Sequence, residues 1–495
     1  MSPIGSQIQR RITRRQFAQG SAVTLFALGL PSLAYARRPR RSPNEEIRVA
    51  VAGIRSRGRN HINGFHSLPN VRVVALCDVD RAFLEKEARA FEERGEKVAL
   101  EVDFRRILER DDVDVVSIAT PNHWHSLQAI WACQAGKDVY LEKPVSHNVW
   151  EGGRIVAAAR KYGRIVQTGT QARSSQGIAE AIAWLHAGNL GKIEVARGLC
   201  YKPRPSIGKV DGPQKPPATV DYDLWTGPAP LKPLMRARLH YDWHWVYDTG
   251  NGDVGNQGIH QMDLARWALG ETELAPSVMS VGGRFGYDDD GNTPNTQMVV
   301  HGYARAPLIF EVRGLPRSKA KQAENWGAGM DTYMGARIGV IVHCEKGHLL
   351  IPDYSQATAF DEAGEPIETW KGSSDHFANF IGAVRSRNVD DLSSDIREGH
   401  VSSALCHMGN VSHLLGTRMP RDEIAATMAE NPAAAETYER FLAHLDANKI
   451  DLAKAKPVLG PTLALDPKSE RFGTEAANRL LARDYREPFV VPEKV

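Results

Sequence analysis

The chain has 495 residues, of which 42% are hydrophobic and 24% charged, a composition typical of a globular protein and not of a disordered one. Its 62 basic and 59 acidic residues give a formal charge of +3, so there is no electrostatic reason to expect nucleic acid as a partner. The length allows two domains with sizeable cores.

The first 36 residues follow the order of a signal peptide. Thr13-Arg14-Arg15-Gln16-Phe17 precedes an apolar run over residues 20–30, and Ala34-Tyr35-Ala36 offers a small-x-small cleavage site. The twin arginines indicate export of a folded protein. The apolar run is shorter than the roughly 20 residues that span a bilayer, which favours cleavage over a retained anchor. We expect a periplasmic or otherwise extracytoplasmic protein that meets the twin-arginine translocase during export.

After a polar linker over residues 37–46, short apolar runs alternate with helical patterns up to residue 170. The expected strands are 47–52, 71–77, 113–119, 138–141 and 165–168, and the expected helices are 59–66, 81–94 and 125–135. This alternation with short connections predicts a doubly wound parallel sheet, a Rossmann domain, over residues 47–170.

A glycine turn follows the first expected strand. Gly53-Ile54-Arg55-Ser56-Arg57-Gly58 lies where a dinucleotide pyrophosphate meets a helix N-terminus, although Arg55 replaces the second glycine of the usual fingerprint. Asp78 ends the second strand 20 residues after Gly58, where a carboxylate binds ribose hydroxyls and repels a 2′-phosphate. We predict NAD, with NADP left open by Arg55, Arg57 and Arg81. An α/β domain without a nucleotide is the plainer alternative.

Three further segments carry a resemblance. Residues 119–125 read Ala-Thr-Pro-Asn-His-Trp-His, residues 141–144 read Leu-Glu-Lys-Pro, and residues 252–263 contain Asn256, His260 and Asp263. Together they resemble the Gfo/Idh/MocA oxidoreductases, a family of mostly sugar- and polyol-directed dehydrogenases. The resemblance implies a second, α+β domain whose open and mostly antiparallel sheet covers the nicotinamide. We also expect a homo-oligomer assembled through that sheet.

The resemblance suggests roles for two residues. Hydride removal from a carbinol carbon requires a proton to leave the hydroxyl, and Lys143 at a strand end can stabilise the developing charge. His260 can act as the base, because imidazole titrates near neutral pH. The family commonly has an aspartate where this chain has Asn256, which leaves the identity of the base open. Asp253 or Asp263 is the alternative.

Other site residues are predicted from position and type. The expected cofactor contacts are Gly53, Arg55, Ser56, Arg57, Gly58, Asp78, Thr120, Asn122, His125, Glu142 and Lys143. The expected substrate contacts are Tyr201, Trp243, His244 and Trp245, since aromatic faces suit the C–H faces of a sugar. Packing of the tryptophans on the core is an equal alternative. No metal is expected, because the histidines and aspartates of this region match no common zinc spacing.

The second domain is expected over residues 171–456. It should contain a helix over 174–186, strands over 193–201, 278–282, 297–303, 308–312 and 339–345, and returning helices over 375–386 and 397–415. Residues 457–495 read as an extended tail with one helical stretch near 475–483.

The sequence thus predicts an oxidoreductase that moves a hydride between a CH–OH group and a nicotinamide cofactor, NAD or NADP. The substrate is a sugar, a sugar derivative or a glycoside. An NAD-dependent glycoside hydrolase, working by transient oxidation, elimination and re-reduction, is the first alternative. A non-catalytic binding protein with the same fold is the second, since fold does not fix function. Free NAD should be scarce outside the cytoplasm, so we expect a tightly held cofactor and a redox-neutral cycle.

Overall fold

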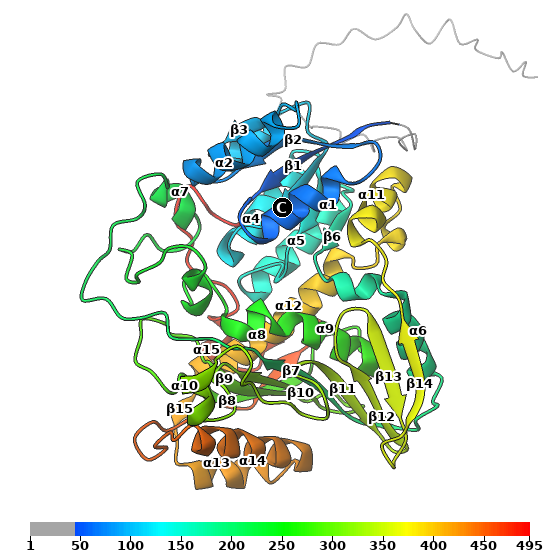
Figure 1. Ribbon diagram of the computed structural model, residues 1–495, viewed down its shortest axis with the longest axis vertical. Coiled ribbons are helices and arrows are strands. Elements are labelled where there is room, and N and C mark those ends of the chain that lie inside the picture. Colours follow the sequence, from blue (N-terminus) through cyan, green and yellow to red (C-terminus); the bar gives the residue numbers. More distant parts are fainter. Residues whose placement is uncertain (1–44) are drawn as a thin grey trace, which may run out of the picture. The chain divides into compact units, whose positions relative to one another are not determined.

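The computed structural model describes residues 45–495 (Figure 1), and the expected leader lies outside the described residues. The first domain holds a six-stranded parallel sheet in the order β3-β2-β1-β4-β5-β6. Its strands are β1 Ile47–Ala52, β2 Val71–Cys77, β3 Ala99–Glu101, β4 Val115–Ile118, β5 Asp138–Leu141 and β6 Val166–Thr168. The order reverses between β1 and β4, which places a ligand-binding crevice at the carboxyl ends of these strands.

Helices cover both faces of this sheet. They are α1 Arg57–His66, α2 Arg81–Glu92, α3 Phe104–Leu108, α4 Asn122–Gln134 and α5 Val149–Lys161. A helix from the far end of the chain, α11 (His376–Ser386), joins them, and Phe380 packs with Phe65 and Tyr140. Helix α4 begins three residues earlier than expected, directly after Pro121, whose fixed φ suits a helix entry.

The second domain holds a mixed sheet in the order β14-β13-β12-β11-β7-β10-β9-β8-β16-β15, with β17 paired to β8. Its strands are β7 Ile193–Tyr201, β8 Ser277–Gly283, β9 Thr296–His301, β10 Leu308–Arg313, β11 Ile338–Cys344, β12 Gly347–Ile351, β13 Gln356–Phe360, β14 Pro366–Lys371, β15 Thr417–Arg418, β16 Val458–Leu459, β17 Leu463–Asp466 and β18 Arg471–Phe472. Apart from the parallel pair β7–β10, its described pairings are antiparallel. The predicted fold class is therefore confirmed, although β12 to β14 were not predicted.

Helices also cover both faces of the second sheet. One face packs on α6 (Gln176–His186), α9 (Gly258–Leu269) and α12 (Ile396–Leu414). The other packs on α13 (Arg421–Met428) and α14 (Pro432–Ala447), where Tyr438, Phe441 and Leu445 meet apolar side chains of β8, β9 and β10. Helices α13 and α14 cover the β8–β10 part of that face, and the homo-oligomer expected through this sheet stays a prediction.

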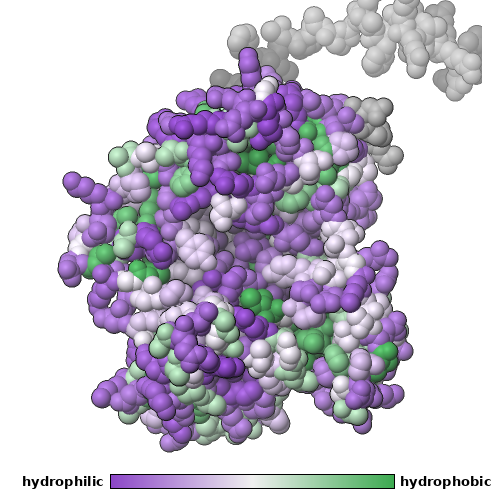
Figure 2. Space-filling view, in the orientation of Figure 1, coloured by the Kyte–Doolittle hydropathy of each residue, from purple (hydrophilic) through white to green (hydrophobic). Residues whose placement is uncertain are grey.

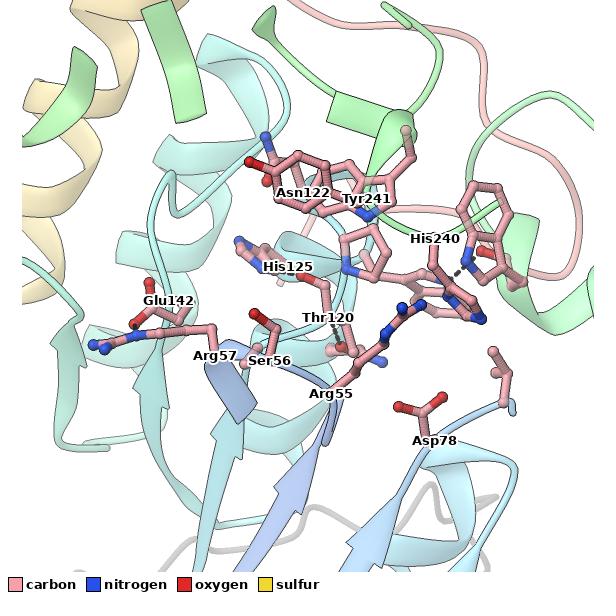
Figure 3. A pocket seen from close by; sticks show the side chains of 18 of the residues that line it. Arg55, Ser56, Arg57, Asp78, Thr120, Asn122, His125, Glu142, His240 and Tyr241 are labelled. Carbon is pink, nitrogen blue, oxygen red and sulfur yellow. Dashed lines mark hydrogen bonds and ion pairs between the residues drawn. The ribbon is translucent and has the colours of Figure 1, made fainter. Parts of the chain in front are cut away.

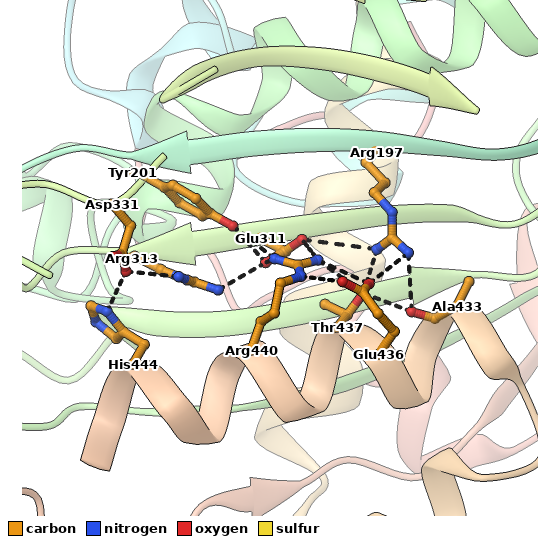
Figure 4. Close-up of polar contacts among 10 residues, drawn as sticks. All are labelled: Arg197, Tyr201, Glu311, Arg313, Asp331, Ala433, Glu436, Thr437, Arg440 and His444. Carbon is orange, nitrogen blue, oxygen red and sulfur yellow. Dashed lines mark hydrogen bonds and ion pairs between the residues drawn. The ribbon is translucent and has the colours of Figure 1, made fainter. Parts of the chain in front are cut away.

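A charged network lies between α14 and the sheet (Figure 4). Arg440 donates to both oxygens of Glu311 at 2.7 Å, and it also pairs with Glu436. Burial opposes ionisation of Glu311, but the hydrogen bond and charge of Arg440 hold its pKa below the usual range. Three arginines and three carboxylates alternate through the network: Arg197, Arg313, Arg440, Glu311, Asp331 and Glu436.

Two further findings concern the described residues alone. Across residues 45–495, no helix has both the length and the apolar character needed to cross a bilayer. Within the same range, no three histidine, cysteine or acidic side chains gather as metal ligands would.

Candidate active site

A cavity of about 580 Å³ opens at the carboxyl ends of the Rossmann strands (Figure 3). This volume lies within the range of small-molecule sites. Apart from Gly58, every predicted cofactor contact lines it: Gly53, Arg55, Ser56, Arg57, Asp78, Thr120, Asn122, His125, Glu142 and Lys143. The second domain closes it with Lys202, Leu224, Trp225, His240, Tyr241, Trp243, His244, Asn256 and Gln257.

The glycine turn forms the floor of the cavity. Gly53 has φ of 75°, and a Cβ there would lie 2.6 Å from the backbone of Ala119, so only glycine fits. Gly58 does not reach the cavity, because its Cα faces the Gly53 carbonyl and a Cβ would lie 1.7 Å from that oxygen. Its role is to let α1 begin against β1. Ser56 and Arg57 then present the N-terminus of α1 to the cavity, as a pyrophosphate requires.

Asp78 follows β2 and lies beside the glycine turn. Its carboxylate accepts the N–H groups of Ile54 at 3.1 Å and Asp80 at 3.0 Å, while burial raises its pKa to about 6. The guanidinium of Arg55 stacks 4.7 Å from the ring centre of Phe83. Figure 3 shows the Arg55 side chain extending towards His240, so the residue that breaks the glycine fingerprint lies along the cavity wall.

Glu142 and Lys143 follow β5 at the centre of the cavity. Glu142 accepts from Arg57 Nε at 2.6 Å and contacts His61 Nε2 at 3.1 Å. Burial disfavours its charge, yet Arg57 and His61 hold its pKa well below the usual range. Arg57 Nη2 is buried and has no hydrogen-bond partner among the described residues. A dinucleotide with its many acceptor oxygens fits such a lining.

Lys143 is the titratable group best placed for chemistry. Its Nζ donates to the backbone carbonyl of Asn256 at 2.7 Å. Burial lowers its pKa, Glu142 opposes that shift, and the positive charges of Arg57 and Lys202 add to it. An amine with a lowered pKa is neutral over more of the working pH range, so it can accept a proton.

His260 lies one layer behind the cavity and does not line it. Burial, followed by the charge of Lys143, lowers its pKa to about 3, and its Nδ1 is buried without a hydrogen-bond partner in the part of the chain that is described. The side-chain amide of Asn256 donates to Asp253 at 3.5 Å. Because an amide is neutral, Asn256 cannot raise the pKa of the imidazole as an aspartate in its place would. His260 is therefore a neutral side chain here.

Neither aspartate proposed as a substitute base is free. Asp253 accepts two hydrogen bonds of 2.7 Å from Arg204. Asp263 accepts from Arg173 at 2.8 Å and from Ser402 at 2.7 Å, and it does not line the cavity. The structure thus removes Asp263 from the candidate bases, because its charge is neutralised in the core of the second domain.

Two of the four predicted substrate contacts reach the cavity. The rings of Trp243 and His244 stack with centres 3.6 Å apart and line its wall. Trp245 is 4% exposed and packs under the guanidinium of Arg204, as the core-packing alternative had it. Tyr201 is fully buried, and its hydroxyl donates to Glu311 in the network under α14.

The correction for Tyr201 follows from strand geometry. Successive side chains of a strand point to opposite faces. Arg197 and Tyr201 of β7 face α14, whereas Cys200 packs in the cluster on the α9 side. The next residue, Lys202, then lies at the cavity. We missed Lys202 because the sequence does not say which face of β7 meets the cofactor domain.

His125 and Asn122 connect the segments around the cavity. The ring nitrogens of His125 lie 2.6 Å from the Pro144 carbonyl and 2.7 Å from the Thr120 carbonyl. Asn122 donates to the Asn251 side chain at 2.9 Å. Both residues line the cavity, but their polar atoms hold the strand-end loops in place.

The outer wall of the cavity is a loop over residues 203–249 that is fastened from two sides. Arg81 N–H donates to the Thr219 carbonyl at 3.0 Å, which ties the loop to the start of α2. From the C-terminal tail, Arg486 binds the Asp223 carboxylate at 2.7 Å and the Gly227 carbonyl at 3.1 Å. Phe489 is buried against Trp124 in the Rossmann core. The tail therefore wraps its own first domain.

The first domain is a Rossmann sheet with a glycine turn, an acidic residue after β2 and a lysine after β5. A second domain with a mixed sheet closes the cavity. This arrangement is the fold of a two-domain nicotinamide-dependent oxidoreductase. Residues 47–170 match the family model described as "Oxidoreductase family, NAD-binding Rossmann fold", and residues 192–302 match its "C-terminal alpha/beta domain". Residues 47–170 therefore form an NAD-binding Rossmann domain of the type found in the Gfo/Idh/MocA oxidoreductases. The two matched segments together cover a little under half of the chain.

Curated relatives match part of the chain. A glycosyl hydrolase family 109 protein from Saccharopolyspora erythraea is 31% identical over 160 residues, which are 31% of this chain and 35% of that protein. An alpha-N-acetylgalactosaminidase from Shewanella oneidensis is 31% identical over 122 residues, 24% of this chain and 27% of that protein. The chain thus spans about a third of the length of the curated relatives it matches.

Solved structures share the fold. The WlbA dehydrogenase from Bordetella pertussis, in complex with NADH and UDP-GlcNAcA, has a TM-score of 0.54 at 19% identity, covering 74% of this chain and 96% of its own. A levoglucosan dehydrogenase in complex with NADH and levoglucosan has a TM-score of 0.54 at 17% identity, covering 74% and 98%.

Proposed function

We propose that this oxidoreductase acts on a CH–OH group of a sugar, a sugar derivative or a glycoside. The observation that carries the proposal is the position of Lys143, whose Nζ is held at the cavity with a lowered pKa. The stacked rings of Trp243 and His244 line the same cavity and suit the apolar face of a sugar.

The residues divide the chemistry between binding and proton transfer. The bound nicotinamide supplies the hydride acceptor. Lys143 Nζ takes the proton of the substrate hydroxyl, held in position by the Asn256 carbonyl. His260 stays neutral behind it, so it orients groups without taking the proton. The ion pair between Glu142 and Arg57 fixes the loop that carries Lys143.

We further propose that the cofactor stays bound through the catalytic cycle. The doubly fastened loop over residues 203–249 supports this, because it must move before a dinucleotide can leave. A retained cofactor also suits export through the twin-arginine route, which the leader predicts. Fractionation of cells that express the wild type or Arg14→Lys/Arg15→Lys tests that route, and equal amounts in the periplasm would contradict it.

The NAD-dependent glycoside hydrolase remains a second candidate, and the glycosyl hydrolase family 109 relatives favour it. One assay separates the two functions. Purified protein is incubated with nitrophenyl N-acetyl-α-galactosaminide and no added NAD in one arm, and with free sugars plus added NAD in the other. Release of nitrophenol indicates the hydrolase, and net NADH formation indicates the dehydrogenase. A protein that does neither and carries no dinucleotide is a binding protein.

A further inference from the structure

Two lysine side chains, Lys143 and Lys202, line the cavity from the two domains. Lys143 Nζ donates to the Asn256 carbonyl at 2.7 Å, and Lys202 Nζ donates to Gln257 Oε1 at 3.1 Å. The two acceptors belong to consecutive residues, so the two amines converge on the junction between α8 (Gly252–Asn256) and α9. Both acceptors are neutral, and neither lysine forms an ion pair with any residue that the structure describes.

The carboxylates around this junction are already neutralised. Glu142 is paired with Arg57 at 2.6 Å, and Asp253 is paired with Arg204 through two hydrogen bonds of 2.7 Å. The charge of Lys202 therefore remains without a counter-charge from the protein, and a proton that Lys143 takes up adds a second positive charge beside it. An unmatched charge in a partly enclosed site is favourable when a ligand supplies the opposite charge.

The cofactor pyrophosphate does not supply that charge. Its place is the glycine turn, where Ser56 and Arg57 present the N-terminus of α1. Lys202 instead follows β7 in the other domain and binds the residue next to the partner of Lys143. The unmatched charge thus lies at the reacting end of the cavity.

We propose that the substrate is an anionic sugar, carrying a carboxylate or a phosphate, and that Lys202 recognises this group. The inference rests on the proposed function and names the substrate class of that site. The anion binds Lys202 as a charge-assisted hydrogen-bond acceptor, while the reacting hydroxyl faces Lys143. Lys202 is a specificity residue, since the anionic group takes no part in bond changes.

The test measures binding without requiring turnover. Glucose, glucuronate and glucose 6-phosphate are titrated into the NAD-loaded protein, and quenching of tryptophan fluorescence reports binding beside Trp243. The wild type should bind an anionic sugar about tenfold or more tighter than glucose, an advantage that shrinks at high salt. Lys202→Met should remove the preference for the anionic sugars over glucose. Lys202→Arg should restore part of it, and Lys215→Met, a change at an exposed lysine, should match the wild type.

Equal affinity for glucose and both anionic sugars in the wild type would overturn the inference. So would a Lys202→Met variant that loses glucose and anionic sugars alike. A preference for glucuronate or for glucose 6-phosphate identifies which anion is read. Binding with this preference but without NADH formation would refute the proposed oxidation and leave the inference standing. NADH formation from glucose but from neither anionic sugar would support the proposed oxidation and refute the anionic substrate.

Discussion

Two clusters of charged side chains in the described part of the chain, one beneath α14 and one in the cavity, differ in one respect. Beneath α14, three arginines and three carboxylates meet in alternation, and Glu311 alone accepts from Arg440, Arg313 and Tyr201 (Figure 4). In the cavity, Lys143 and Lys202 bind only neutral acceptors, and Arg57 keeps one unpaired donor (Figure 3). A cluster whose charges balance holds a fold together. A cluster with unmatched donors is built for a ligand.

The face of the molecule shown in Figure 2 carries no large apolar patch that would compete with the cavity as a binding site. Hydrophilic side chains dominate the face shown in Figure 2, and the hydrophobic residues on it are scattered in small groups. Scattered exposed apolar residues are normal for a folded protein and mark no interface by themselves. The unmatched polar groups of the cavity are therefore the feature that points to function.

The sharpest way to break the comparison is to remove Lys143. We expect Lys143→Met to lower kcat about 10²- to 10⁴-fold, the usual contribution of a general base, because Lys143 is the proposed proton acceptor. Its melting temperature and its bound NAD content should stay near those of the wild type, since Nζ binds a neutral carbonyl. Steady-state kinetics and cofactor analysis check this. A variant within tenfold of wild-type kcat would end the assignment.

In the charged network beneath α14, removal of one charged group should lower the stability of the fold. Glu311→Gln removes the buried carboxylate and leaves the partly buried guanidinium of Arg440 with Glu436 as its one carboxylate partner, so we expect the free energy of unfolding to fall by about 3 kcal/mol. Glu436→Gln, at a half-exposed carboxylate, should cost less than about 1 kcal/mol. Denaturant unfolding measures both, and kcat of the folded fraction should be unchanged. Equal losses in the two variants would show that burial does not set the cost.

The tail contact sharpens the idea of a retained cofactor. Arg486→Ala removes the hydrogen bonds to Asp223 and Gly227, and we expect bound NAD to dissociate about tenfold faster. Dialysis followed by analysis of the remaining dinucleotide gives the rate. Arg479→Ala serves as the control, because Arg479 is exposed. Loss of NAD at the same rate from all three proteins would mean that the tail does not retain it.

The smallest expected effect is a shift in pH dependence. A base must be deprotonated, so kcat/KM should rise with pH and level off below the ordinary lysine pKa, because burial lowers the pKa of Lys143. Lys202 contributes to that lowering, so Lys202→Met should raise the pKa of Lys143 and move the rising limb to higher pH. A pH–rate series on a neutral sugar measures the shift. A limb that moves to lower pH would contradict this reading of the two charges.

Much of the site was predictable because it depends on local order. Alternating strands and helices imply a parallel sheet, and residues at the ends of its strands converge on one edge. Gly53, Asp78, Thr120 and Lys143 therefore fall together, although they come from four different strand ends. The resemblance added the second sheet, which the structure confirms.

Tertiary structure decided which side chains face the cavity and which charges are neutralised. The sequence favoured Tyr201, but the pairing of β7 turns that residue towards α14 and places Lys202 at the site. Asp263 is satisfied by Arg173, 90 positions away along the chain, a pairing that no local pattern indicates. The sequence by itself determined the cofactor domain and its central lysine, because periodicity and strand ends are local properties. Charge balance is a property of neighbours in space, so only the folded chain shows which groups are left for a ligand.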